Sequence, residues 1–114
     1  MYWCITIHSS ISILGNDMVD LNTYCEVCHN VALAKGFWED NRPIAVALML
    51  IVTELAEACE ADRKGDKENF NEEIADTFIR LMDLCGYLKI DIEEEIQRKY
   101  KKNEKRPYKH GKRY

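Results

Sequence analysis

Two pairs of acidic residues near the centre of the sequence have the types and the spacing that could bind a divalent metal ion. They are Glu54-x-x-Glu57 and Glu73-x-x-Asp76, with Gly65 midway between the pairs. A spacing of three residues puts both carboxylates of a pair on one face of a helix. Because the two pairs are equally far from Gly65, a helical hairpin that turns there would gather all four carboxylates into one layer.

Such a layer is electrostatically unfavourable by itself, since two like charges about 4 Å apart repel by roughly 4 kcal/mol at an effective dielectric constant of about 20. A cation or shared protons would have to offset this repulsion. The alternative is that these are solvated surface side chains, which is how most glutamates behave. Both pairs, however, interrupt apolar stretches. We therefore predict a metal site, and oxygen ligands favour Mg²⁺, or Mn²⁺, over zinc.

The elements that must position these acids are predicted to be helices. The chain has only two prolines and five glycines, and it is rich in residues that favour helices. We expect four helices: residues 19–35, 41–63, a third from about residue 69 and a fourth from residue 91. Gly36 would end the first helix, and Pro43 would lie in the first turn of the second. Asn69 and Asp91 are each followed three residues later by a glutamate, which is typical of a helix start.

Apolar residues on the second and third helices exceed what a small monomer could cover. The second helix is apolar nearly all round in its first half, and the third carries two apolar stripes. This pattern predicts assembly as a dimer or tetramer; the alternative is a monomeric bundle whose second stripe is covered by the N-terminal arm. The face predicted to be buried on the second helix consists of Ile44, Leu48, Ile51, Val52, Leu55 and Cys59.

The length of 114 residues indicates one domain, which we place at residues 18–114 after an N-terminal extension at residues 1–17. The net charge of −4 combines an acidic centre with a basic C-terminal end. This distribution argues against a nucleic-acid polymer as partner. No stretch reaches the ~20 apolar residues of a membrane span, and no secretory signal is evident. We therefore expect a cytoplasmic protein that does not bind a membrane.

The sequence resembles the MazG-like family of all-α nucleoside triphosphate pyrophosphohydrolases over roughly residues 21–114. The resemblance lies in the residues Gly36-Phe37-Trp38, in the runs at 54–58 and 72–76, and in Asn103-x-x-Arg106-Pro107. It implies a bundle of about four helices that cleaves NTPs or dNTPs between the α and β phosphates, giving NMP or dNMP and pyrophosphate. It also implies that Glu54, Glu57, Glu73 and Asp76 hold Mg²⁺ and act in catalysis.

Further residues are candidates for binding the substrate. Lys99, Asn103 and Arg106 share one face of the fourth helix and could clamp phosphates, although a basic helix end is also favoured by the helix dipole. The family has a similar Lys-x-x-x-Asn-x-x-Arg element. Phe37 and Trp38 could stack on a nucleobase, or they could cover the junction between the first two helices.

Several alternatives remain open at this point. The general base could be one of the four acids or a neighbour such as Glu60. The substrate could be phosphoribosyl-ATP, or the chain could be a non-catalytic helical interaction module whose acidic layer is stabilised by metal. Cys25-x-x-Cys28-His29 spells a c-type haem attachment motif. We reject haem attachment, because no export signal is evident and both cysteines lie on the apolar stripe of a predicted helix, where we expect buried free thiols.

Overall fold

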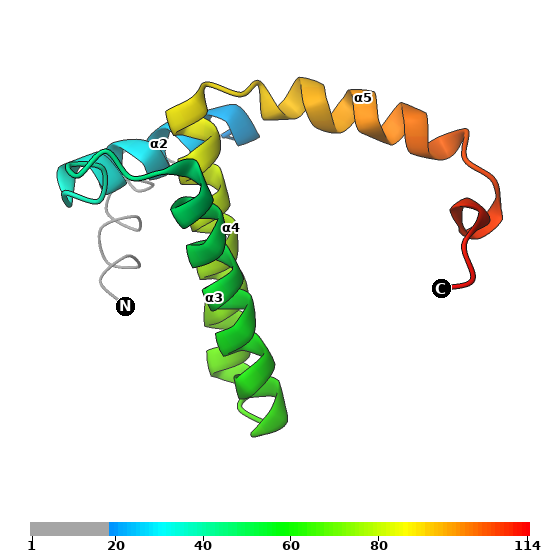
Figure 1. Ribbon diagram of the computed structural model, residues 1–114, viewed down its shortest axis with the longest axis horizontal. Helices are drawn as coiled ribbons and strands as arrows, with labels where there is room; N and C mark the ends of the chain where they lie inside the picture. Colours follow the sequence, from blue (N-terminus) through cyan, green and yellow to red (C-terminus); the bar gives the residue numbers. More distant parts are fainter. Residues whose placement is uncertain (1–18) are drawn as a thin grey trace.

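An antiparallel hairpin of two long helices forms the framework of the structure (Figure 1). The computed structural model describes residues 19–114, and its hairpin consists of α3 (Ile44–Arg63) packed along α4 (Lys67–Leu88). Gly65 in the connecting turn has a φ of +71°, a left-handed conformation that glycine adopts without steric cost. The Asp66 N–H donates to the Ala61 carbonyl at 2.9 Å across the turn. The hairpin predicted from the position of Gly65 is confirmed.

The start of α4 differs from the prediction, because the helix begins at Lys67 rather than near Asn69. Asp66 is the N-cap, and its carboxylate accepts a hydrogen bond from the Asn69 N–H at 3.1 Å. A carboxylate at this position satisfies an otherwise unpaired N–H and also complements the positive end of the helix dipole. The start of α3 also differs from the prediction, because the helix begins at Ile44 rather than near residue 41. Pro43 is its N-cap and precedes the first turn.

The first described helix, α2 (Leu21–Ala34), crosses α4 at a point of very close approach. A Cβ atom at Gly86 would lie 2.5 Å from the Cys25 carbonyl oxygen and 2.7 Å from the Cβ of His29. Only glycine therefore fits at this crossing. Cys25 and Cys28 are buried free thiols, as predicted, and burial raises the pKa of Cys28 to about 12.

Trp38 joins the two parts of the hydrophobic core, because it packs against both of its buried clusters. One cluster lies on α2 and receives Phe37 as well as Trp38. The other lies between α3 and α4 and consists of Ala47, Ile51 and Leu84. The loop between α2 and α3 thus closes the core on this side.

The face of α3 that packs on α4 is not the face predicted from the sequence. It is lined by small residues together with Ile51 and Glu54, whereas Leu48, Val52 and Leu55 are about half exposed. Small side chains let the two helices pack closely, which leaves the large ones on the outer surface. Of the residues predicted to be buried on α3, Ile51 is buried and the others are exposed: Ile44, Leu48, Val52, Leu55 and Cys59.

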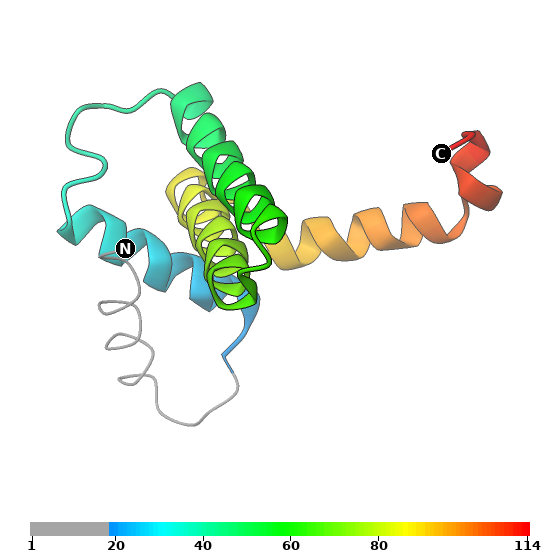
Figure 2. The ribbon, with the colours of Figure 1, turned by 90° about the horizontal axis from the view of Figure 1, so that it is seen from below.

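The last helix, α5 (Ile92–Glu104), extends away from the hairpin instead of packing beside it as the fourth member of a bundle (Figures 1 and 2). Its start is held by α2, since the Asn22 side chain donates to Asp91 at 2.9 Å and accepts from the Ile92 N–H at 3.1 Å. A short 3-10 turn, η1 (Tyr108–Gly111), follows. The described residues contain four α-helices and no strand, which confirms the prediction of an all-α fold.

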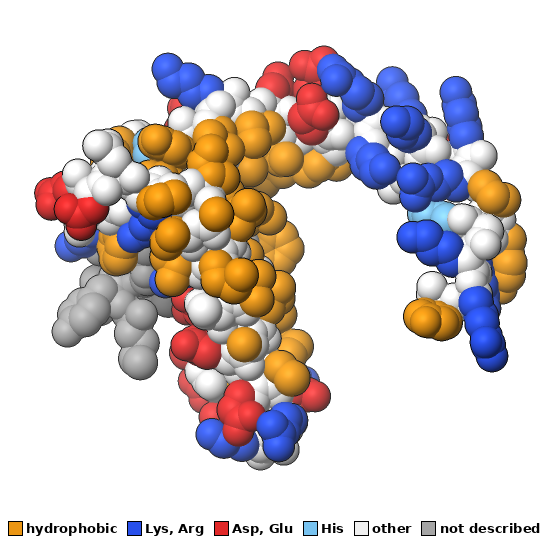
Figure 3. All heavy atoms as spheres, in the orientation of Figure 1, with side chains coloured by type: hydrophobic (Ala, Val, Ile, Leu, Met, Phe, Trp, Pro, Cys, Tyr) orange, Lys and Arg blue, Asp and Glu red, His pale blue; other side chains and the backbone are white. Residues whose placement is uncertain are grey.

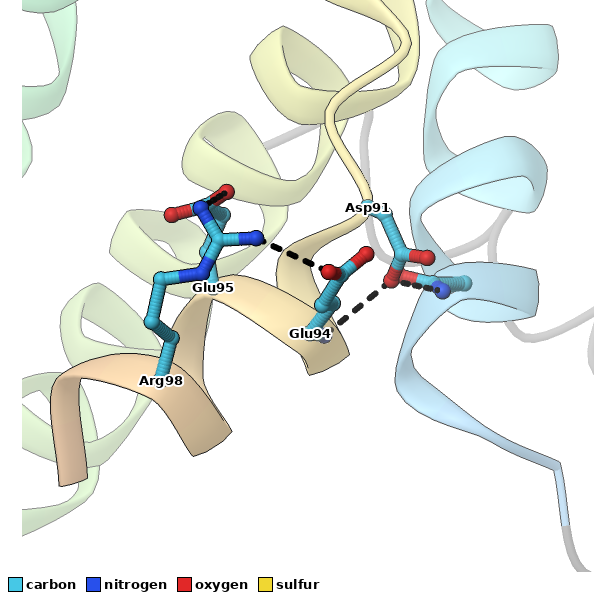
Figure 4. A network of polar contacts seen from close by, with 5 residues as sticks. Asp91, Glu94, Glu95 and Arg98 are labelled. Carbon is cyan, nitrogen blue, oxygen red and sulfur yellow. Dashed lines mark hydrogen bonds and ion pairs between the residues drawn. The ribbon is translucent and has the colours of Figure 1, made fainter. Parts of the chain in front are cut away.

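A network of polar contacts surrounds the first turn of α5 (Figure 4). Asp91 caps the helix as predicted, because its carboxylate accepts from the Glu94 N–H at 3.1 Å. Arg98 then pairs with Glu94 at 2.8 Å and with Glu95 at 3.4 Å. These ion pairs are exposed and therefore contribute little to stability. The direction of α5 is fixed by the cap, by the contacts to Asn22 and by Glu93, whose carboxylate accepts from the Leu21 N–H at 2.8 Å.

In the part of the chain that is described, no helix has the length and apolar character needed to cross a membrane. The extension proposed at residues 1–17 lies outside the described residues.

Candidate metal centre

Three carboxylates from the two arms of the hairpin converge between α3 and α4. Glu54 and Glu57 come from α3 and Glu73 from α4, and one carboxylate oxygen of each lies within 4.8 Å of the other two. The spacing within the α3 pair and the antiparallel alignment about Gly65 account for this convergence. Glu54 is only 8% exposed, whereas Glu57 is exposed to solvent.

Asp76, the fourth predicted acid, lies three residues further along α4 and outside this three-residue group. Burial raises its pKa, and the charge of Glu54 raises it further, so the two side chains interact electrostatically. Glu73 Oε2 and Asp76 Oδ1 are buried and have no hydrogen-bond partner. A buried acceptor left without a partner costs about 1–3 kcal/mol, and a bound ligand would remove this cost.

Glu73 shows most clearly that the cluster is crowded with negative charge. Its pKa is raised to about 7, first by burial and then by hydrogen bonding and charge repulsion with Glu54 and Glu57. Without a cation, the cluster therefore carries less than its full negative charge near neutral pH, because Glu73 is partly protonated there.

Arg80 belongs to the same centre, and the sequence reasoning missed it. Its Nε donates to Glu54 Oε1 at 2.6 Å, and both side chains are largely buried. Burial raises the pKa of Glu54, but hydrogen bonds with Arg80 and the neighbouring glutamates, together with the charge of Arg80, outweigh it, so that this pKa is lower than usual. The signal in the sequence was the position of Arg80 four residues after Asp76, on the same face of α4.

The donor set fits a small, hard cation. It offers carboxylate oxygens, two of which are buried without a partner, and it includes no thiol or imidazole that would favour zinc. Glu54, Glu57 and Glu73 would hold such an ion, with Asp76 beside them as a fourth oxygen donor. Mg²⁺ and Mn²⁺ are the ions that this chemistry favours.

Glu60, the neighbour considered as a general base, is directed elsewhere. It pairs with Arg63 at 3.3 Å and with Lys64 at 3.7 Å on the exposed side of α3. It also lies outside the group of carboxylates that converge on α4. These ion pairs make Glu60 a weaker candidate than the four acids themselves.

The two aromatic residues predicted to bind a base are held within the fold. Trp38 stacks on Tyr87 with ring centroids 4.0 Å apart, and its Nε1 donates to Asp83 Oδ1 at 3.0 Å. The Arg42 guanidinium lies 5.7 Å from the ring centroid of Phe37 and 5.6 Å from that of Trp38. Both rings pack on the core yet remain partly exposed, so the structure assigns them at least a packing role.

The predicted phosphate-binding residues all belong to the arm formed by α5 and the residues after it. Lys99 is exposed, and Arg106 lies just beyond the helix, where it contacts His110 at 2.9 Å. Asn103 is half-buried, and its Oδ1 has no hydrogen-bond partner. Because α5 extends away from the hairpin (Figure 1), this arm is separated from the acidic cluster of its own chain.

The described part of the chain is all-helical, and acidic pairs from two antiparallel helices form an oxygen-rich cluster. These features define a class of candidate metal-binding α-helical proteins. Comparison with known families makes this more specific, because the model of the MazG nucleotide pyrophosphohydrolase domain matches residues 44–110. This range covers more than half of the chain and includes all four acids and Arg80. The protein belongs to the MazG nucleotide pyrophosphohydrolase family. No curated protein and no solved structure matched the chain.

Proposed function

We propose that the protein is a Mg²⁺-dependent nucleoside triphosphate pyrophosphohydrolase that cleaves NTPs or dNTPs between the α and β phosphates. The products would be NMP or dNMP and pyrophosphate. The observation that carries this proposal is the cluster of Glu54, Glu57 and Glu73, with unpartnered oxygens on Glu73 and Asp76, in a chain of this family. Mn²⁺ is the alternative ion. We also propose a cytoplasmic location for the protein.

The bound ion would neutralise the charge of the triphosphate and lower the pKa of a water molecule that attacks phosphorus. The role of the protein is to hold the four carboxylates at fixed positions. The packed helices α3 and α4 provide this rigidity, and the buried position of Glu54 fixes one corner of the cluster. Glu57 is exposed and lies where substrate can approach. One of the four carboxylates is proposed to accept the proton of the water.

The base of the nucleotide is proposed to contact the exposed parts of Phe37 and Trp38. Stacking on an aromatic ring contributes about 1–3 kcal/mol per base and depends little on which base is bound. Arg42 lies over both rings and could add a cationic contact to the nucleotide.

The phosphates are proposed to bind Lys99, Asn103 and Arg106 from a second copy of the chain. The basic arm extends away from the hairpin, while large apolar side chains cover the outer face of α3 and part of α4 (Figure 3). Phe78 on α4, for example, is 59% exposed. A contiguous apolar surface of this kind is typical of an interface. A dimer or tetramer would cover it and could bring the basic arm of one copy to the acidic cluster of another.

The test is pyrophosphate release from a panel of nucleoside triphosphates and phosphoribosyl-ATP, measured with and without Mg²⁺. We expect Mg²⁺-dependent release from the nucleoside triphosphates, and its loss in Glu57→Gln. The matched control is Glu60→Gln, an exposed glutamate on the same helix that lies outside the cluster. Activity confined to phosphoribosyl-ATP would identify the other substrate class. Stabilisation by Mg²⁺ without any turnover would contradict the enzyme assignment.

A further inference from the structure

Arg80 places a permanent positive charge inside the acidic cluster. Its Nε donates to Glu54 Oε1 at 2.6 Å, and the two side chains are 18% and 10% exposed. This contact is much less exposed than the other arginine–carboxylate ion pairs of the described chain, such as Arg98 with Glu94 at 65% and 61%. A partly desolvated, charge-assisted hydrogen bond of this length holds the carboxylate in one orientation.

The hydrogen bond restricts how Glu54 can bind a metal ion. Bidentate coordination needs both oxygens of a carboxylate, and Oε1 of Glu54 is engaged by Arg80. Glu54 therefore offers its other oxygen more readily and would bind as a monodentate ligand. Mg²⁺ requires near-octahedral coordination with short, single-oxygen contacts, whereas Ca²⁺ takes six to eight oxygens and accepts bidentate carboxylates.

We propose that Arg80 is a positioning residue that sets the preference of the centre for Mg²⁺ over Ca²⁺ by holding Glu54 in a monodentate orientation. This inference rests on the proposed function, since it takes the acidic cluster to be a metal site. Partners that orient a metal ligand commonly change metal affinity by about 10- to 100-fold when they are removed. The effect of Arg80 falls on the choice of ion, because the side chain acts on ligand geometry.

The ratio of the two affinities is the quantity to measure. Removing the charge of Arg80 strengthens the electrostatic attraction of the site for any divalent cation, while loss of orientation weakens binding. The charge effect is the same for Mg²⁺ and Ca²⁺, because both carry two charges. It therefore largely cancels in the ratio of dissociation constants, and what remains reports the geometry of Glu54.

The experiment is calorimetric titration of the full chain with MgCl₂ and with CaCl₂, without nucleotide. Arg80→Met removes the charge and the donor, and Arg98→Met is the matched control at an exposed ion pair. We expect Arg80→Met to shift the ratio of the Mg²⁺ and Ca²⁺ dissociation constants in favour of Ca²⁺ by about tenfold or more. We expect Arg98→Met to leave this ratio unchanged. Arg80→Gln is the second variant, should the methionine variant fail to fold, and it is expected to shift the ratio in the same direction.

Three outcomes would be distinct. A shift in the Arg80 variants alone supports the proposal. An unchanged ratio, with Mg²⁺ still binding to the wild type, overturns the role of Arg80 and leaves the proposed function intact. A wild-type chain that binds neither ion overturns the metal centre itself and the inference with it.

Discussion

The imidazole Nδ1 of His29 lies 2.9 Å from Asp83 Oδ1, which links α2 to α4 through a residue that is only 4% exposed. Trp38 Nε1 donates to the same oxygen at 3.0 Å, and the Trp38 and His29 rings meet edge to face. Asp83 is therefore the point at which α2, α4 and the loop before α3 are joined by polar contacts. Its surroundings are those of a structural residue within the core.

Replacement of Asp83 by alanine is expected to lower the free energy of unfolding by about 1–3 kcal/mol, because it leaves the partly buried Trp38 N–H without an acceptor. Asp83→Asn keeps an oxygen acceptor and should cost less. Urea denaturation followed by tryptophan fluorescence and by circular dichroism measures both effects. The control, Asp62→Ala, removes an exposed carboxylate. Equal costs for Asp83→Ala and Asp62→Ala would show that these contacts contribute no stability.

Replacing Gly86 or Gly65 by alanine is expected to destabilise the fold, for a different reason at each position. At Gly86 the added Cβ would meet the Cys25 carbonyl at 2.5 Å, so that α2 and α4 must separate, at a cost of about 1–3 kcal/mol or more. Nothing lies within 4 Å of a Cβ at Gly65, but its φ is +71°, and the strain there costs about 1–2 kcal/mol. Unfolding curves would measure both costs. In addition, near-UV circular dichroism should change for Gly86→Ala, and an unchanged spectrum would argue against the close crossing.

The metal-free protein should become less stable as the pH rises from about 5 to 8. The pKa of Glu73 is about 7 in the folded state and 4.5 as its ordinary value. A group whose pKa is raised by folding stabilises the protein fully below the lower pKa and loses this contribution through the higher one. We expect a loss of about 1–2 kcal/mol, because Glu73 is only half-buried and solvent screens part of the repulsion from Glu54 and Glu57.

Thermal melting at several pH values would measure this slope, and two changes should flatten it. Glu73→Gln removes the titrating group, and saturating Mg²⁺ holds the carboxylates in their ionised form. A slope that survives in Glu73→Gln would show that other groups cause it.

The apolar outer face of the hairpin should be required for assembly. Leu55→Lys places a charge on this face, at a residue that is 47% exposed in the single chain. We expect light scattering to show a smaller species for this variant than for the wild type. Lys101→Glu, which changes an exposed charge on α5, serves as the control. A wild-type protein that is monomeric at all concentrations would contradict the proposed assembly.

Mixing two inactive variants can show whether the active site is shared between copies. In the proposed site, Glu57→Gln is expected to disable the hairpin and Arg106→Ala to disable the basic arm. If the arm acts on the hairpin of a second copy, random exchange gives one copy of each variant in half of the dimers. Each of these dimers has one intact site. Activity should then recover to about a quarter of the wild-type value, as two-fold symmetry requires. No recovery, despite proven exchange of subunits, would place both groups in the same chain.

The sequence by itself determined the helices and the hairpin. Gly65 lies between two acidic pairs of helical spacing, and a glycine in a left-handed turn, flanked by helix-forming residues, leaves the chain few other arrangements. These signals are local, because caps, turns and side-chain periodicity depend on residues a few positions apart. The same features place Glu54, Glu57 and Glu73 together, since antiparallel helices bring equidistant positions into register.

The tertiary structure decided which of the possible faces was used. The apolar residues around α3 allowed more than one buried stripe, and packing selected the one with small side chains and Glu54, because close approach of two helices depends on the shape of both. The pairing of Arg80 with Glu54 spans 26 residues, and the contact of His29 with Asp83 spans 54. Such contacts, like the direction of α5, follow from how separate helices meet, which no local pattern specifies.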